Sequence, residues 1–327
     1  MATYKEIFGT NIEVLASDPA NPVTGQVWYN STDNLVKGNA ATTVGAWATG
    51  TNIGSSRYLS GGAGTKTAAL VFGGEGPPGL IGSTESWNGT SWTEVNDLNT
   101  ARVGMANSIG TYTATLSAGG NPVSALNESW NGTSWTEVSD LNTGRLYFGG
   151  SGADNTSAIV FGGATPPPTA ATESWNGSAW TEVNNLNTAR RNVVGAGKLH
   201  NAALAISGGT PPSSPVVANV ENWNGTSWTE VNDVNTARGY GGASGTPLAA
   251  LFYGGTTGSN TGATESWNGT SWTEVADLAT ARHGLSSAGT TNTAALASAG
   301  ITPVARSNNV EEWTGAGSPL IQTFTDS

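Results

Sequence analysis

The sequence predicts an all-β protein built from small repeated antiparallel sheets, and three observations support this fold class. The chain of 327 residues contains 46 Gly and 13 Trp but only 11% charged residues. Charged residues usually make up about a quarter of a globular chain, so this surface suits short strands and turns better than amphipathic helices. A string beginning Glu-x-Trp recurs along the chain. Its full copies contain Asn-Gly between alternating residues, which is a strong β-hairpin signal.

The repeat combines this string with an Arg that follows its second Trp by ten residues. The strings start at Glu85, Glu128, Glu173, Glu221, Glu265 and, in a degenerate copy, Glu311. Their tryptophans are Trp87 and Trp92, Trp130 and Trp135, Trp175 and Trp180, Trp223 and Trp228, Trp267 and Trp272, and Trp313, with Trp47 in an N-terminal half-copy. The arginines are Arg57, Arg102, Arg145, Arg190, Arg238 and Arg282, spaced 45, 43, 45, 48 and 44 residues apart. Such a period indicates a repeat architecture.

Each repeat is expected to form four strands. One follows the Arg, one ends at a Gly pair such as Gly73-Gly74, one carries Glu-x-Trp and one starts at the second Trp. An Asn-Gly turn of type I′ would pair Trp87 with Thr90. Strand alternation then places the two tryptophans of a repeat on one face of its sheet, where they can pack between neighbouring sheets. Four-stranded units arranged radially form a β-propeller.

The order Arg, diglycine, Glu-x-aromatic and Trp, at about 45 residues per copy, resembles the kelch motif over residues 46–313. This resemblance implies a kelch-like β-propeller. Trp replaces the common Tyr, and the turn before the second Trp is shortened to Asn-Gly. We expect the repeated Trp residues to form the core between blades. We expect the repeated Arg residues to be partly buried and paired with Glu or with backbone carbonyls.

The halves of the repeats predict six blades. The last unit lacks a second Trp, and the half-copy at Trp47 would supply it, so that an N-terminal strand closes the ring and removes free sheet edges. A seven-bladed alternative stays open, in which Leu320 to Thr325 fill that place and the N-terminal strands start a partial blade. The predicted domains are therefore an attachment-like segment at residues 1–45 and a propeller at residues 46–327.

The N-terminal segment does not fit the repeat. Residues 25–38 predict a strand, a polar turn and a strand. This hairpin, with the Pro-containing stretch before it, is similar to N-terminal segments of bacteriophage virion proteins, especially tail-fibre-like ones. The resemblance implies docking to other virion proteins, with Trp28 and Tyr29 as candidate contacts. The alternative is that these two aromatic residues cover one mouth of the propeller.

Charge and composition exclude several functions. A formal net charge of -11 disfavours nucleic acid. No stretch of 18 apolar residues predicts membrane insertion, and the N-terminus does not resemble a signal peptide. Without Cys there is no thiolate nucleophile or Cys-ligated metal. His200 and His283 are expected to be surface residues, so no catalytic residue, metal or other cofactor is predicted.

The connections between the second and third strands differ in every repeat, and rigid, diverse loops on a constant scaffold are typical of recognition surfaces; neutral drift is the alternative. The candidate ligand-binding residues in these loops are Pro77, Pro78, Leu80, Pro122, Pro166, Pro167, Pro168, Pro211, Pro212, Ser213, Ser259, Asn260 and Pro303. The expected function is a non-enzymatic virion appendage, made in the host cytoplasm, whose loops bind a host-surface glycan or protein. The alternatives are a kelch-type protein interaction module and a polysaccharide-acting enzyme.

Overall fold

The computed structural model of the protein describes residues 12–19, 26–41, 45–106, 109–211, 215–315 and 319–324. It contains two compact units, one formed by Met1–Gly45 with Thr314–Ser327 and the other by Ala46–Trp313. The predicted boundary thus differs at the C-terminus, because β29 (Pro319–Phe324) pairs with β3 (Leu35–Ala41) and not with the last repeat. The alternative that placed residues 320–325 in the last sheet is therefore wrong for the part of that segment that the structure describes.

The first unit is a four-stranded sheet in the order β1-β2-β3-β29. The hairpin expected within residues 25–38 is present as β2 (Val27–Asn30) and β3, and β1 (Glu13–Leu15) lies parallel to β2. Trp28 is fully buried, and its indole Nε1 donates a hydrogen bond to Asp18 at 3.0 Å. The carboxylate of Asp18 also accepts bonds from Asn30 and, at 2.9 Å, from Lys37. These bonds, led by the one from Lys37, lower the pKa of Asp18 to about 2.

We expect the first unit to open at low pH. A carboxylate whose pKa is depressed on folding stabilises the fold above its ordinary pKa, and this stabilisation is lost as the pH falls through the folded value. Cleavage of the first unit by pepsin should therefore accelerate as the pH falls from 4 to about 2, the folded pKa of Asp18. At neutral pH, Asp18→Asn should accelerate cleavage by trypsin after Lys37, which is 9% exposed. Asp33→Asn removes only a more exposed partner of Lys37 and should accelerate trypsin cleavage less. Equal rates of trypsin cleavage for the two variants would contradict this role for Asp18.

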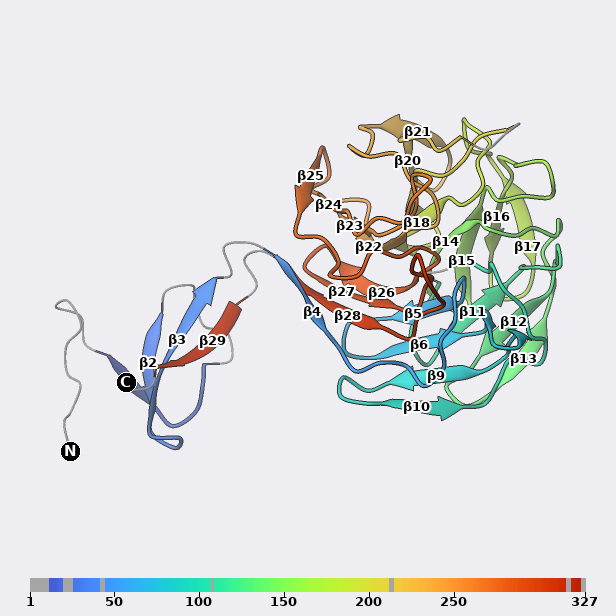
Figure 1. Cartoon of the computed structure of the whole chain (residues 1–327). Coiled ribbons are helices and arrows are strands. Elements are labelled where there is room, and N and C mark those ends of the chain that lie inside the picture. Colours follow the sequence, from blue (N-terminus) through green and yellow to red (C-terminus); the bar gives the residue numbers. More distant parts are fainter. Residues whose placement is uncertain are drawn as a thin grey trace. The chain divides into compact units, whose positions relative to one another are not determined.

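Within the described residues, the second unit contains a small two-stranded sheet, β7 (Glu75–Gly76) with β8 (Gly79–Leu80). Its other six sheets share one plan, five being four-stranded and one three-stranded. Figure 1 shows them arranged around a centre, with β5, β22 and β26 inside and β10, β13, β17, β21 and β25 outside. In chain order within each sheet the strands are β5 (Gly61–Gly64), β6 (Ala69–Phe72), β9 (Thr84–Trp87) and β10 (Trp92–Val95); β11 (Thr115–Ala118), β12 (Asn127–Trp130) and β13 (Trp135–Val138); β14 (Gly149–Asp154), β15 (Ser157–Phe161), β16 (Thr172–Trp175) and β17 (Trp180–Val183); β18 (Val194–Leu199), β19 (Ala202–Ile206), β20 (Val220–Trp223) and β21 (Trp228–Val231); β22 (Gly242–Thr246), β23 (Ala249–Tyr253), β24 (Thr264–Trp267) and β25 (Trp272–Val275); and β26 (Ser286–Thr291), β27 (Ala294–Ser298) and β28 (Val310–Thr314) with β4 (Ala46–Thr49).

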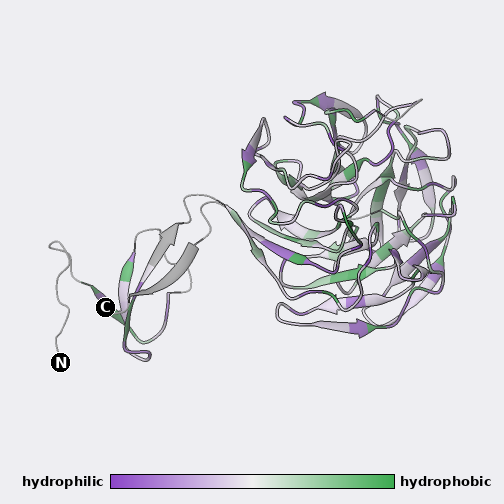
Figure 2. Cartoon of the chain, in the orientation of Figure 1, coloured by the Kyte–Doolittle hydropathy of each residue, from purple (hydrophilic) through white to green (hydrophobic). Residues whose placement is uncertain are grey.

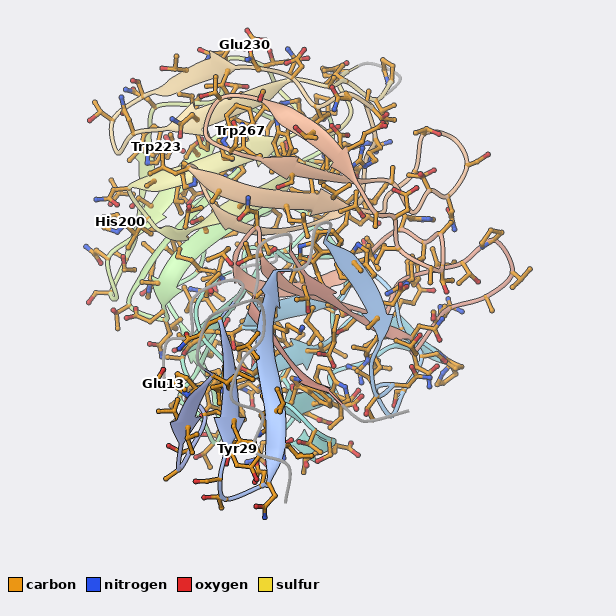
Figure 3. All side chains as sticks on the ribbon, turned by 90° about the vertical axis from the view of Figure 1, so that its left-hand side faces the viewer. Glu13, Tyr29, His200, Trp223, Glu230 and Trp267 are labelled. Atoms are coloured by element: carbon orange, nitrogen blue, oxygen red, sulfur yellow. The ribbon has the colours of Figure 1, made fainter. Side chains whose placement is uncertain are left out.

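Neighbouring sheets pack through their tryptophans. Ala63, Leu70 and Phe72 of one sheet form a cluster with Trp130 and Trp135 of the next. The first Trp of every repeat is at most 3% exposed. Figure 3 labels Trp223 and Trp267 among the strands and Glu230 and His200 at the periphery, and Figure 2 shows hydrophilic colour on the outer strands β10, β21 and β25. Burial of such large aromatic side chains supplies much of the hydrophobic stabilisation of a fold.

The hairpin between the last two strands differs from the predicted turn by one residue. Trp87 pairs with Trp92, and the amide of Asn88 donates to the carbonyl of Ser91, so Gly89 and Thr90 form the centre of the turn. Only Gly89 has a positive φ, of 91°, as in turns with Gly at the first central position. The carboxamide of Asn88 accepts bonds from the amides of Thr90 and Ser91 at 2.9 Å. This local side-chain bond is available to Asn and favours the shifted turn.

Glycines bring the inner strands close together. A Cβ added at Gly195 would lie 2.1 Å from the carbonyl oxygen of Gly150, and one at Gly62 would lie 2.8 Å from the amide nitrogen of Ser287. These positions approach the backbone of the neighbouring sheet, where only Gly fits. At these two junctions the inner strands thus pack backbone to backbone, while the tryptophans pack side chain to side chain further out.

Candidate functional site

Each repeat contains one buried ion pair between its Arg and the Glu of Glu-x-Trp. All six arginines are at most 1% exposed and the six glutamates at most 4%. The pairs are Arg57 with Glu85 at 2.7 Å, Arg102 with Glu128 at 3.2 Å, Arg190 with Glu221 at 2.8 Å, Arg238 with Glu265 at 2.6 Å, and the closer pairs Arg145 with Glu173 and Arg282 with Glu311. Burial lowers the pKa of each Arg, and the paired carboxylate opposes this shift. The charge of each Arg is therefore neutralised by its Glu inside the fold and is not available to a ligand.

The same arginines fix the bases of the variable loops. Arg57 donates to the carbonyls of Gly73 and Ser83, at 3.3 and 2.6 Å, which flank the first loop. Arg145 binds the carbonyls of Gly162 and Ala171 in the corresponding way. In these two repeats the Arg therefore holds both ends of the loop at a fixed point on one face of the sheets, which we call the loop face.

The described candidate residues of the loops are mostly exposed. Leu80 is 40% exposed, while Pro168 and Asn260 are partly buried. Pro212 and Ser213 lie outside the described residues. Exposed at the loop face are Pro77, Pro78, Pro122, Pro166, Pro167, Pro211, Ser259 and Pro303. These prolines have no side-chain hydrogen-bonding group, so they shape the loops rather than supply polar contacts.

At the centre of the loop face, six residues join the repeats through a circle of backbone hydrogen bonds. Each lies two positions after a repeat Arg. The amide of Leu59 donates to the carbonyl of Gly284, Gly104 to Leu59, Tyr147 to Gly104, Asn192 to Tyr147, Tyr240 to Asn192 and Gly284 to Tyr240, at 2.7–3.3 Å. We call these six residues the central circle. Because every donor and acceptor is satisfied by a neighbouring repeat, the circle connects the first repeat to the last.

All six residues of the central circle have a positive φ, between 54° and 75°. Gly occupies two of the positions without strain, but Leu59, Tyr147, Asn192 and Tyr240 carry side chains there. A non-Gly residue in this conformation costs about 1–2 kcal/mol, somewhat less for Asn. Strained residues of this kind cluster at functional sites. The protein thus keeps four side chains at the centre of the loop face at a cost in stability.

Two of these side chains begin a polar and aromatic cluster. The rings of Tyr147 and Tyr240 meet edge to face at 5.5 Å, and the ring of His283 lies 5.7 Å from that of Tyr240. Burial raises the pKa of both tyrosines and lowers that of His283, so all three are neutral at pH 7. Asn260, a candidate loop residue, contacts Nδ1 of His283 at 2.7 Å. The cluster therefore joins a predicted loop residue to the central circle.

Arg191 adds a positive charge to this cluster. It interacts electrostatically with both tyrosines and forms no salt bridge within the described part of the chain. Its buried Nε and the buried Oδ1 of Asn192 lack hydrogen-bond partners there, which is unusual for buried polar atoms. We call Tyr147, Arg191, Asn192, Tyr240 and His283 the central cluster.

A second polar group flanks the cluster on the loop face. The hydroxyl of Tyr58 donates to Glu75 at 2.9 Å, and Glu75 forms an ion pair with Arg306, whose guanidinium lies over the Tyr58 ring at 5.4 Å. The residue after each Arg forms a β-bridge with the start of the variable loop in its own repeat, as Tyr58 does with Glu75. This pairing places loop residues and post-Arg residues on one surface.

Asn260, which contacts His283, was predicted as a binding residue, but none of the residues of these two groups was, although the repeats contain a signal for them. Each Arg is invariant across the six copies, whereas the two residues after it differ: Tyr58-Leu59, Val103-Gly104, Leu146-Tyr147, Arg191-Asn192, Gly239-Tyr240 and His283-Gly284. Because these two positions vary beside an invariant Arg, the fold does not require a particular residue there. The virion-docking candidates lie in the other unit, where Trp28 is buried and Tyr29 is partly exposed, with its hydroxyl bonded to Asn34.

The centre of the loop face suits binding on a surface rather than in a deep pocket. Its depression holds only about 40 Å³, close to the ~30 Å³ that one water occupies in the liquid. Among the described residues there is no group of three His, Asp or Glu that could hold a metal ion. The described part of the chain also contains no helix long and apolar enough to cross a membrane.

Comparison with known proteins establishes the architecture. No protein-family model matches the chain, and no curated protein matches it. In contrast, 410 chains of solved structures match it, and YjhT is among them. YjhT aligns over 84% of this chain and 99% of its own, with a TM-score of 0.64 at 15% identity. The chain has a β-propeller fold. At this identity the likeness shows the fold alone, and folds so widely shared carry many unrelated functions.

Proposed function

We propose that the protein is a non-enzymatic recognition protein of a phage virion, a six-bladed propeller closed by β4, whose loop face binds a host-surface glycan or protein. The closed central circle and the pairing of β4 with β28 support six blades and closure. The resemblance of the N-terminal hairpin to virion proteins supports the setting. Docking through the first unit would use its exposed surface, such as Tyr29, because Trp28 is buried.

One observation carries the binding role. Tyr147, Asn192 and Tyr240 keep side chains at strained positions where two other repeats use Gly. Packing does not require them, since Gly104 and Gly284 make the same backbone bonds. Together with Arg191 and His283 they offer aromatic faces, amide groups and one unpaired cation. Such a mixture suits a polar surface ligand, and multiple copies on a particle would multiply weak contacts.

The double variant Tyr147→Gly/Tyr240→Gly tests this role without a large cost in folding. Each Gly relieves the strain of a positive φ, which stabilises the fold by about 1–2 kcal/mol. This gain offsets the entropy cost of Gly, about 0.5–1 kcal/mol, and part of the loss of the ring contacts. We therefore expect a folded protein that no longer binds. Tyr112→Ala is the matched control, because this 42% exposed tyrosine lies in the turn before β11, at the end of its sheet opposite the connection between β11 and β12.

The measurement is adsorption of the labelled full-length protein to intact cells of candidate bacterial hosts. Periodate treatment of the cells should abolish adsorption to a glycan, and protease treatment should abolish adsorption to a protein. Unchanged adsorption of the double variant would overturn the assignment of the central cluster. Release of reducing ends from surface polysaccharide by the purified protein would favour an enzyme instead.

The virion setting has its own test. Mass spectrometry of density-purified particles should detect the chain at a stoichiometry of several copies per particle after a high-salt wash. Detection only in the unassembled fraction of the lysate would contradict the setting and favour the alternative, an intracellular interaction module.

A further inference from the structure

A polar pocket of about 360 Å³ lies at the junction between the first and last sheets of the propeller unit. It is bounded by residues that follow β4 and by β9, β10 and the turn between them, and it includes Trp92 and Glu94. The pocket is separate from the central cluster and shares no residue with it. Its volume lies at the lower end of the ~300–1,000 Å³ typical of small-molecule sites.

The pocket exists because this junction departs from the repeat. At four other junctions, an Asn three residues before the Arg donates its side-chain amide to the carbonyl of the second Trp. These bonds join Asn99 to Trp135, Asn142 to Trp180, Asn187 to Trp228 and Asn235 to Trp272, at 3.1–3.5 Å. Gly54 occupies the corresponding position beside Trp92.

One further difference lies beside the same junction. Seven residues before the Arg, the first repeat has Gly50, whereas the second has Val95, which packs against the core cluster of the next junction. Trp92 is consequently only partly buried, whereas Trp135, Trp180, Trp228 and Trp272 are 5–6% exposed. One side of the Trp92 ring packs against Trp87 at 5.2 Å, and the indole Nε1 donates to the carbonyl of Thr51 at 2.9 Å. The indole is thus held in place at the edge of the pocket.

The lining defines the chemistry of a ligand. Arg57 is neutralised by Glu85 at the floor, so the carboxylate of Glu94 is the uncompensated charge, and it makes no hydrogen bond within the described chain. This charge disfavours an anion. Exposed hydroxyl and amide groups of Thr51, Asn52 and Ser91 disfavour an apolar ligand. A ring with an apolar C–H face and several hydroxyls satisfies both the aromatic and the polar walls.

We propose that this junction pocket binds a neutral hexopyranose unit, with its C–H face on Trp92 and its hydroxyls on Glu94, Asn52 and Thr51. The proposal does not depend on the role of the loop face. A sugar bound here would also bridge the first and last sheets, so binding should raise the melting temperature of the propeller.

Saturation-transfer NMR on the full-length protein tests the pocket, with the methyl glycosides of glucose, galactose, mannose and N-acetylglucosamine as probes. At least one neutral glycoside should receive saturation, strongest at its ring C–H protons. N-acetylneuraminic acid, an anion of similar size, should receive none. Absence of transfer to every neutral probe at millimolar concentration, or preference for the acid, would overturn the proposal.

Gly54→Asn is the decisive variant, because it installs the Asn that four of the other five junctions have at this position. Its φ is not positive, and its amide already bonds to Glu85 as that of Asn99 bonds to Glu128. Affinity should fall at least tenfold while the melting temperature is kept or raised. Unchanged affinity would refute the site. The variant Tyr147→Gly/Tyr240→Gly should still bind the glycosides, which separates a failure of this proposal from a failure of the proposed function.

Discussion

Glu173→Gln is expected to destabilise the propeller by about 3–5 kcal/mol, the usual cost of removing one partner of a buried ion pair. Glu173 and Arg145 are both 0% exposed, so the guanidinium would keep its charge without a counterion. The carboxylate also accepts the amide of Asn142 at 2.7 Å, which ties the preceding connection to the sheet. Equilibrium unfolding in urea, followed by tryptophan fluorescence, measures the shift in midpoint.

Glu182→Gln is the matched control, because Glu182 lies directly across from Glu173 on β17 and is exposed. Its change in stability should stay within about 0.5 kcal/mol, as for other surface substitutions. The double variant Arg145→Met/Glu173→Met should cost less than the sum of the two single changes, since no charge is left unpaired. A Glu173→Gln midpoint equal to that of the control would contradict the structural role of the pair.

Gly195→Ala is expected to cost about 3 kcal/mol or more, at or beyond the upper end of ordinary overpacking. The added Cβ would lie 2.1 Å from the carbonyl oxygen of Gly150 and 2.7 Å from its amide nitrogen. Both atoms belong to the backbone of a neighbouring sheet and cannot turn aside as a side chain would. The inner strands would have to separate, which would weaken the packing of two sheets.

Gly79→Ala provides the comparison at a site where an added Cβ meets nothing within 4 Å. There the substitution should be neutral or stabilising by up to about 1 kcal/mol, because it reduces the entropy of the unfolded chain. The same urea titration compares the two variants. A Gly195→Ala protein as stable as Gly79→Ala would show that the inner strands tolerate separation.

The sequence predicts the sheets well because its signals are local and repeated. Alternation along Glu-x-Trp places both tryptophans on one face, and the structure pairs Trp87 with Trp92 and packs such residues between sheets. The turn was displaced by one residue because the Asn88 side chain competes for the backbone amides. The pairing of β29 with β3 was missed, since residues 319–324 carry no repeat signal and strand pairing across the chain leaves little local trace.

Less of the candidate site could be predicted from the sequence. The variable loops were predicted because they differ between the copies of the repeat and contain prolines. The side chains at the centre, such as Tyr147 and Asn192, come from single positions beside the conserved Arg, and their proximity depends on positive φ values that no sequence pattern predicts for Tyr. The junction pocket required the comparison of Gly54 with Asn99, Asn142, Asn187 and Asn235 in three dimensions.

The central circle has a consequence for biosynthesis. Its last link joins Leu59 to Gly284, and β4 reaches β28 across more than two hundred residues of intervening sequence. In a nascent chain leaving the ribosome, β4 therefore lacks its partner strand until β28 has emerged. Contacts of such long range slow folding, and unpaired strand edges invite misassembly meanwhile. Translation speed over the final repeat should thus influence the yield of correctly closed molecules more than translation speed at the start.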